Sequence, residues 1–164
     1  MTPKPVVFED YQEISDLMRR LGMVIPETNA TARRLWSGLW LENPAFLHYE
    51  QRPVFGWKVE SKARIVGFFG NIPQVYWLGN KKIKVSVARA WAVEKGFRSS
   101  VADLCAAFFN QEEIDLAIIS SANKAASERC KQFGSFQMPE ASYREVLYWI
   151  VSPARFTRSV FTKI

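Results

Sequence analysis

The stretch that most constrains the fold runs from Val85 to Phe109, where a strand pattern passes directly into a helix pattern. In its first half, larger residues alternate with Ser and Ala, and a period of two predicts a strand. The larger residues share one parity: Val85, Val87, Arg89, Trp91 and Val93. The second half, Val101–Phe109, is apolar at helical spacing. The first N–H groups of a helix lack partners within it, so a strand that leads into a helix is an arrangement able to bind anions.

The rest of the chain supplies further strands and helices on either side of this stretch. We expect helices at 11–21, 30–41 and 123–133, and strands at 6–8, 56–61, 64–70, 74–78, 81–93, 115–121 and 143–151. Antiparallel strands come first, and strand–helix–strand–helix follows. This order predicts an α+β (mixed α/β) fold with a central mixed, mostly antiparallel sheet flanked by helices.

Local signals refine this outline at four places. Asp10 with Glu13, and Ser100 with Asp103, have the spacing of capping boxes at the starts of two helices. Gly79-Asn80 predicts a two-residue hairpin turn. Pro73 has no N–H to donate to a ladder, so we expect a bulge or a sheet edge there.

The central stretch also resembles a known signature. Val93, four residues, Phe97-Arg98 and an apolar helix resemble the motif of the GCN5-related N-acetyltransferases (GNAT), which reads Val, four residues, Arg-x-x-Gly-x-Gly and then a helix. A second motif of that family is Asn-x-x-Ala-x-x-x-Tyr-x-x-x-Gly-Phe. It is similar to the residues that follow the next strand: Asn123, Ala126, Cys130, Gly134, Ser135 and Phe136.

The resemblance implies an acyltransferase that uses acetyl-CoA or another acyl-CoA as co-substrate and transfers an acetyl group to an amine. Backbone amides from Ser99 to Asp103 would hold the pyrophosphate beside Arg98. The pantetheine arm would lie in a gap between the strand ending at Val93 and the strand 116–119. The implied cofactor-binding residues are Trp91, Ala92, Val93, Arg98, Ser99, Ser100, Val101, Ala102, Asp103 and Asn123. Asn123 has a second reading as a helix N-cap.

The sequence departs from the family pattern at three positions. Val101 and Asp103 stand where the motif has glycines, and Cys130 stands where it has tyrosine, a common general acid in the family. A side chain at a glycine position crowds the approach of a phosphate, and a thiol donates a proton poorly. Glu94, at the end of the strand, is the candidate base. Two interpretations therefore stay open. The chain is an N-acyltransferase, or it is a degenerate, non-catalytic GNAT-like domain that serves as a binding or structural domain of a larger protein.

Composition limits the other classes of function. The resemblance implies an amine acceptor, either a small molecule or a peptide. The chain has a formal charge of +6, but its basic residues are scattered, so we expect neither nucleic acid nor membrane as a partner. One histidine, His48, and two cysteines without metal-ligand spacing argue against a metal site. No apolar run reaches the roughly 18 residues that span a membrane, and we expect a cytoplasmic protein.

The length of 164 residues fits one domain. We assign residues 1–151 to the acyltransferase domain. Residues 152–164 carry basic residues among apolar ones and fall outside the family pattern, so we expect a tail or the start of a further domain. A homodimer and a second domain C-terminal to this chain both remain open as partners.

Overall fold

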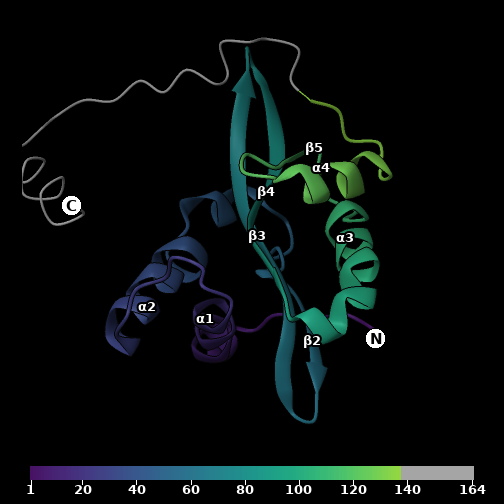
Figure 1. Cartoon of the computed structure of the whole chain (residues 1–164). Helices are drawn as coiled ribbons and strands as arrows, with labels where there is room; N and C mark the ends of the chain where they lie inside the picture. The colour runs from purple at the N-terminus through teal and green to yellow at the C-terminus, as the bar shows by residue number, and fades with distance from the viewer. Residues whose placement is uncertain (138–164) are drawn as a thin grey trace, which may run out of the picture. The chain divides into compact units, whose positions relative to one another are not determined.

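A five-stranded sheet forms the middle of the unit Met1–Gly134 (Figure 1). The computed structural model describes residues 1–137. The strands follow one another in chain order, with antiparallel neighbours except for the last pair, which is parallel. They are β1 (Lys4–Pro5), β2 (Gly56–Ser61), β3 (Arg64–Leu78), β4 (Lys81–Val93) and β5 (Leu116–Ile118). The predicted mixed, mostly antiparallel sheet is confirmed.

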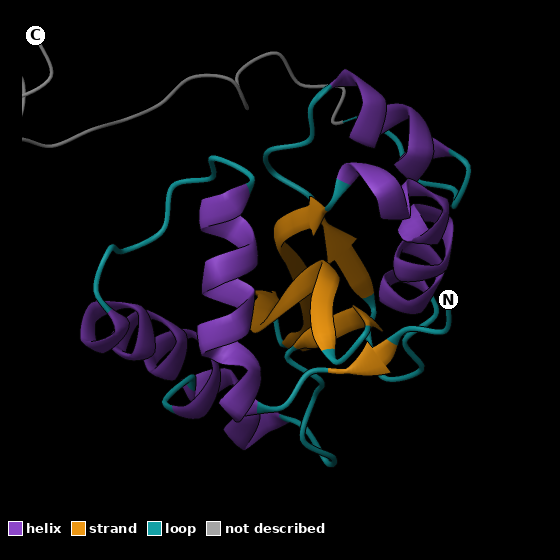
Figure 2. Ribbon diagram, turned by 60° about the horizontal axis from the view of Figure 1, so that its bottom comes forward, coloured by secondary structure: helices purple, strands orange, loops and turns teal. Residues whose placement is uncertain are grey.

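Helices cover both faces of this sheet (Figure 2). One pair is α1 (Tyr11–Arg20) and α2 (Asn29–Trp36), and the other is α3 (Val101–Phe109) and α4 (Lys124–Lys131). A π-helical turn, Ser37–Leu41, extends α2, which accounts for the longer helix expected from the sequence. Short 3₁₀ helices lie at Phe8–Asp10, Pro44–His48 and Lys95–Ser100. None of the helices among residues 1–137 is long and apolar enough to cross a membrane.

The core beneath α1 and α2 is aromatic. Trp36 and Trp40 are fully buried and stack with their ring centroids 4.4 Å apart, and Trp36 also meets Phe68 edge to face. The Trp36 indole N–H donates to Ser15 Oγ at 2.9 Å, so its polar atom is satisfied inside the core. The aromatic face of the second helix therefore packs inward.

The core beneath α3 and α4 contains a second stack of rings. Phe69 lies between Phe108, at 4.5 Å, and Trp91, at 4.7 Å, and Trp57 contacts Phe108 edge to face. Cys130 of α4 belongs to this core and is buried. The two cores lie on opposite faces of β3 and β4, because alternate residues of a strand point to opposite faces.

A bulge at Ala90 interrupts β4 and corrects the alternation expected from the sequence. Phe69 of β3 pairs with Trp91 and the next residue pairs with Arg89, so Ala90 has no partner across the ladder. Its φ is +57°, in the left-handed region. Ala88 consequently packs in the core of α3 and α4, whereas Ala90 packs in that of α1 and α2. The single parity predicted for residues 85–93 is therefore wrong beyond Arg89.

Glycine is required directly across from this bulge. A Cβ added to Gly70 would come within 2.2 Å of the backbone oxygen of Arg89 and 2.7 Å of the Phe68 ring. Pairing of β2 with β3 ends at Gly70, so the continuation of β3 through Pro73 lies at a sheet edge on that side. The edge expected at the proline is present, but the bulge lies in another place.

Other local expectations have mixed outcomes. The hairpin turn at Gly79-Asn80 is confirmed, with Leu78 paired to Lys81. The first strand is two residues earlier than predicted, since residues 8–10 form a 3₁₀ turn. The strand expected at 115–121 is shorter, Leu116–Ile118. The strand expected at 143–151 and the segment 152–164 lie outside the described residues.

Neither predicted capping box forms. The Glu13 carboxylate accepts from the backbone N–H of Ile65 at 2.7 Å, across to β3, and Asp10 accepts from Lys58 at 2.7 Å. Asp103 contacts the N-terminal amino group of Met1 at 3.5 Å. Each carboxylate has thus found a partner distant in sequence.

Candidate functional site

A cleft opens where β4 and β5 part. Their parallel pairing extends only from Val85 to Val87 on β4, opposite Leu116–Ile118. Beyond that point a cleft of about 600 Å³ lies between the second half of β4 and the segment that leads from β5 to α4. Its lining comes from β4, the start of α3, the segment 119–123 and one face of α4.

The cleft receives side chains from both faces of the sheet. Trp91, Val93 and Ile119 belong to the core of α3 and α4, whereas Ala90 and Met23 pack with the core of α1 and α2. Met23 lies in the connection between α1 and α2. An extended ligand in the cleft therefore has access to groups on either side of the sheet.

Five of the ten residues expected to bind the cofactor line this cleft: Trp91, Val93, Arg98, Val101 and Asn123. The side chain of Ala92 instead packs in the core of α1 and α2, because the bulge at Ala90 reverses the parity of the strand. Ser99 is exposed, Ser100 is buried, and neither lines the cleft; Ala102 and Asp103 do not line it either.

The start of α3 keeps its backbone N–H groups free of a side-chain cap. Ser100 is the N-cap residue, but its side chain makes no capping hydrogen bond. Its Oγ is buried without a partner in the described part of the chain. Val101, the first residue of α3, lies at the cleft. The backbone N–H of Val101 donates to the backbone oxygen of Arg98 in the preceding 3₁₀ helix, so any capacity of this turn to bind an anion lies in the N–H groups that follow Val101.

The electrostatic character of the lining is positive. Arg98 and Arg129 contribute two guanidinium groups, and no acidic residue is among the described residues that line the cleft. Arg129 also donates to Gln132 at 2.6 Å, which fixes its side chain along α4. We did not single out Arg129 from the sequence. The available signal was its position three residues after Ala126, which places both on one helical face.

Asn123 occupies the N-cap of α4, as one of its two readings predicted. Its Oδ1 accepts from the backbone N–H of Ala126 at 2.9 Å. The side chain also lines the cleft. Its amide nitrogen has no hydrogen bond within residues 1–137, so capping leaves this donor available to a ligand.

The two candidates for proton transfer lie elsewhere. The Glu94 carboxylate is held by Arg20 at 3.1 Å and by Arg64 at 2.8 Å, and Glu94 does not line the cleft. Cys130 is buried beside Cys105 rather than facing the cleft. Their mutual hydrogen bond raises the pKa of the Cys105 thiol and lowers the pKa of Cys130. The geometry therefore favours structural roles for both residues.

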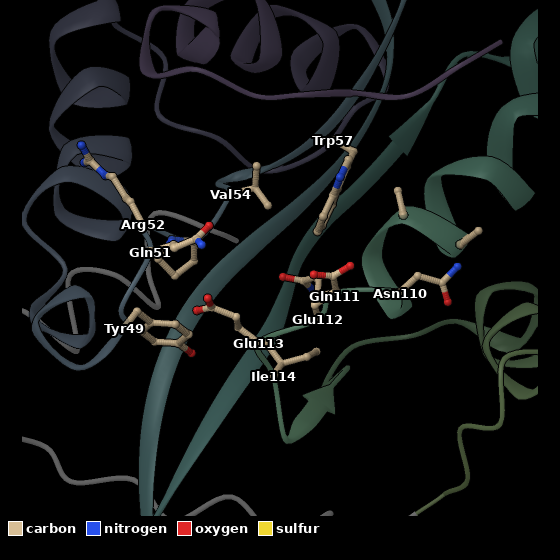
Figure 3. A pocket seen from close by; sticks show the side chains of 13 residues that line it. Tyr49, Gln51, Arg52, Val54, Trp57, Asn110, Gln111, Glu112, Glu113 and Ile114 are labelled. Carbon is tan, nitrogen blue, oxygen red and sulfur yellow. The ribbon is translucent and has the colours of Figure 1, made fainter.

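A second cavity, of about 490 Å³, lies between the segment 49–54 and the C-terminal end of α3 (Figure 3). Tyr49 and Glu113 lie on one side of it, and Gln111 and Glu112 lie beneath Trp57. The Tyr49 hydroxyl lies 3.0 Å from the backbone oxygen of Gln74, and burial raises the pKa of Tyr49. None of the residues predicted to bind the cofactor lines this cavity.

No protein-family profile and no curated protein sequence matches the chain, but solved structures match its fold. Glucosamine-6-phosphate N-acetyltransferase from Arabidopsis thaliana is 13% identical, with a TM-score of 0.60 over 85% of this chain and 96% of that one. An acetyltransferase from Clostridium acetobutylicum, solved with acetyl-CoA, is 12% identical, with a TM-score of 0.60 over 92% of this chain and 96% of that one. An acetyltransferase from Trypanosoma brucei is 16% identical, with a TM-score of 0.57 over 88% of this chain and 98% of that one.

The chain has the fold of the GCN5-related N-acetyltransferases. The order of elements that the two sequence motifs implied is thus the order of this acetyltransferase fold. The departures at Val101, Asp103 and Cys130 lie at the start of α3 and on the buried side of α4. They leave the fold intact, and of the three only Val101 lines the cleft.

Proposed function

We propose that the protein is an acyl-CoA-dependent N-acyltransferase, and that acetyl-CoA or another acyl-CoA occupies the cleft between β4 and β5. The observation that carries this proposal is the coincidence of three features at one place. Strand pairing ends after Val87, the cleft begins there, and the uncapped start of α3 lies at its edge with Arg98 and Arg129 in the lining.

The described residues fit the chemistry of coenzyme A. A pyrophosphate needs backbone N–H donors and positive charge, which the first turn of α3 after Val101 and the two arginines would supply. An extended pantetheine arm needs backbone groups with no strand partner, and β4 beyond Val87 has none on its β5 side within the described residues. The co-substrate would supply a thioester, whose carbonyl carbon is attacked by the acceptor amine.

Amine attack releases a proton from nitrogen and a thiolate from the thioester. The described lining of the cleft has no carboxylate, imidazole or phenol to exchange these protons. The contribution of residues 1–137 to the rate would then be to position the two reactants, which can itself be large. The same observation favours the second candidate function, a domain that binds coenzyme A without catalysis.

Calorimetric titration of acetyl-CoA and free coenzyme A into the full chain at low salt tests the cofactor site. We expect micromolar binding, weakened about tenfold by Arg98→Ala and by Arg129→Ala, because each removes a charge-assisted hydrogen bond to phosphate. Lys131→Ala is the matched control, since Lys131 lies on α4 outside the lining and pairs with Glu128. Absence of binding, or equal loss in the control, would refute the proposal.

A second measurement separates catalysis from binding. Release of free thiol from acetyl-CoA is followed over a panel of amines, with and without protein. Release that depends on both an amine and the intact Arg98 supports the transferase. Tight binding of acetyl-CoA with no amine-dependent release over the panel supports the non-catalytic alternative. Val101→Gly tests the crowding at the motif glycine, and tighter binding by this variant is the expected result.

A further inference from the structure

The β3–β4 hairpin extends past both of its neighbouring strands (Figure 1). Pairing with β2 ends at Gly70, and pairing with β5 begins at Val85, so residues 75–84 have only each other as strand partners in the described sheet. Such a two-stranded ribbon gains little from burial of its own side chains. Its sequence should therefore be polar unless the ribbon serves another purpose.

The end of this hairpin is instead markedly apolar and aromatic. Trp77 is 63% exposed and Leu78 is 74% exposed, and Tyr76 beside them is also exposed. Leu47, 86% exposed, extends this surface, because its neighbour His48 accepts a hydrogen bond from Lys82 of the hairpin. Consecutive strand residues point to opposite faces, so Trp77 projects from one face of the ribbon and Tyr76 and Leu78 from the other. Large exposed side chains on both faces of a hairpin end mark it as an interaction surface.

Each apolar residue at the tip lies beside a lysine. Trp77 pairs across the ribbon with Lys82, and Leu78 pairs with Lys81, and directly paired residues share a face of the ribbon. Both lysines are exposed. No acidic residue occurs between positions 70 and 93, so the charge of the tip is positive. Two acidic residues contact this hairpin at Lys84, away from the turn: Asp115 Oδ2 accepts from its backbone N–H at 2.8 Å, and Glu113 lies 3.8 Å from its Nζ.

We propose that this tip, formed by Leu47, Tyr76, Trp77, Leu78, Lys81 and Lys82, docks on the surface of an anionic lipid membrane. Indole and phenol rings favour the interface between headgroups and acyl chains, and lysines beside them bind anionic headgroups. Leu78 and Leu47 would enter the outer edge of the acyl region. The sequence led us to expect no membrane partner, because its basic residues are scattered and no apolar run could span a bilayer. Surface docking needs neither a continuous basic run nor a spanning segment.

Two other occupants fit these side chains less well. A second copy of the chain, related by twofold symmetry, would bring like-charged lysines of two tips together, and the cores of protein interfaces are depleted in lysine. Single-stranded nucleic acid would stack on Trp77 and Tyr76, but it offers no complement to the exposed leucines, and the surface is a projecting end rather than a groove.

Co-sedimentation of the full chain with large unilamellar vesicles tests the proposal. Vesicles of phosphatidylcholine alone are compared with vesicles containing 30% phosphatidylglycerol. We expect binding to the anionic vesicles at least tenfold tighter than to the neutral ones. Lys81→Gln and Lys82→Gln should each weaken it about fivefold, the effect of one lysine near an anionic surface. Trp77→Ala should weaken it at least as much.

Matched controls exist elsewhere on the chain. Lys62→Gln removes an exposed lysine in the β2–β3 turn, at the opposite end of the sheet (Figure 1), and Val24→Ala trims an exposed apolar residue between α1 and α2. Both should bind like the wild type, and all variants should keep the wild-type melting temperature.

Four outcomes would overturn the proposal. The first is no binding to either vesicle, and the second is binding that Trp77→Ala leaves unchanged. The third is a dimer in light scattering that Trp77→Ala dissociates. The fourth is binding of a single-stranded oligonucleotide that competes with, or exceeds, binding to vesicles. Because none of these measurements involves coenzyme A, failure here leaves the proposed acyltransferase function untouched.

Discussion

Replacing Asn71 with alanine should destabilise the protein more than most substitutions of a polar residue. Asn71 lies on β3 and is 1% exposed. Its Nδ2 donates to the backbone oxygen of Val54 at 2.8 Å and to Gln111 Oε1 at 3.3 Å, and its Oδ1 accepts from Ser86 Oγ at 2.7 Å. The Gln111 amide in turn donates to Ser86 Oγ at 2.9 Å. The side chain thus joins β3, β4, the loop before β2 and the end of α3.

The size of the effect follows from these contacts. Asn71→Ala removes the side chain's three hydrogen bonds and takes a partner from the half-buried carbonyl of Val54, from the half-buried amide of Gln111 and from the buried hydroxyl of Ser86. At about 1 kcal/mol for each hydrogen bond, and more where a buried group is left unpaired, the loss is about 3–5 kcal/mol in the free energy of unfolding. Ser86→Ala removes two hydrogen bonds, the shared one with Asn71 and the one from Gln111, and should cost about 2–3 kcal/mol.

The two changes should not add, because they break a shared contact. We expect the double variant to cost at least 1 kcal/mol less than the sum of the single variants. Urea unfolding, followed by tryptophan fluorescence, measures all three differences, with unchanged m-values as the check on two-state behaviour. Asn110→Ala, at an exposed residue close to Gln111, is the control and should cost less than 0.5 kcal/mol. A double variant whose cost lies within 1 kcal/mol of the sum of the two single costs would refute a coupled network, and so would a cost below 1 kcal/mol for Asn71→Ala.

Three further predictions concern the sheet and the buried thiols. Gly70→Ala should destabilise the protein by about 3 kcal/mol in urea unfolding, since its Cβ would meet a backbone oxygen of β4 at 2.2 Å. Hydrogen bonds from Lys4 and Lys58 lower the pKa of Glu60 from 4.5 to about 2, so Glu60 stabilises the fold above pH 4.5 and this contribution is lost as the pH falls through 2. The Tm difference between wild type and Glu60→Gln should shrink over that range. Cys105 and Cys130 are buried, so mass spectrometry should find both alkylated by iodoacetamide much more slowly in the folded chain than in denaturant; rapid labelling of the folded chain would contradict their placement.

Local signals predicted much of this fold correctly. The strand Gly56–Ser61, the strand Lys81–Val93 and the helix Val101–Phe109 begin and end where the sequence predicted, because each has a clear period and a turn or glycine at its boundary. The hairpin turn at Gly79-Asn80 is equally local. The order of these elements was enough to suggest the fold.

Features that depend on distant partners could not be predicted in this way. Glu13 has the spacing of a capping residue, yet it binds a backbone N–H of β3 that is 52 positions away. The bulge at Ala90 turns Ala92 away from the cleft, a change of parity that depends on how β4 pairs with β3. Arg129 lines the cleft because α4 packs along the edge of the cleft, and no local sequence pattern predicts that packing.

The bulge at Ala90 also helps to fix the register in which β4 pairs with β3. Before it, Ala88 faces the aromatic stack under α3; after it, the bulky Trp91 joins that stack, and small Ala90 and Ala92 face the crowded indoles of the other core. If the strand slipped by one position, an indole would meet the tryptophans under α1 and α2, and a methyl group would leave a void beside Phe69. A slipped register would therefore lower the stability of the fold through a clash in one core and a void in the other. Deletion of Ala90 alone should keep Trp91 paired with Phe69 and Arg89 paired with Gly70, because the deleted residue is the one without a ladder partner.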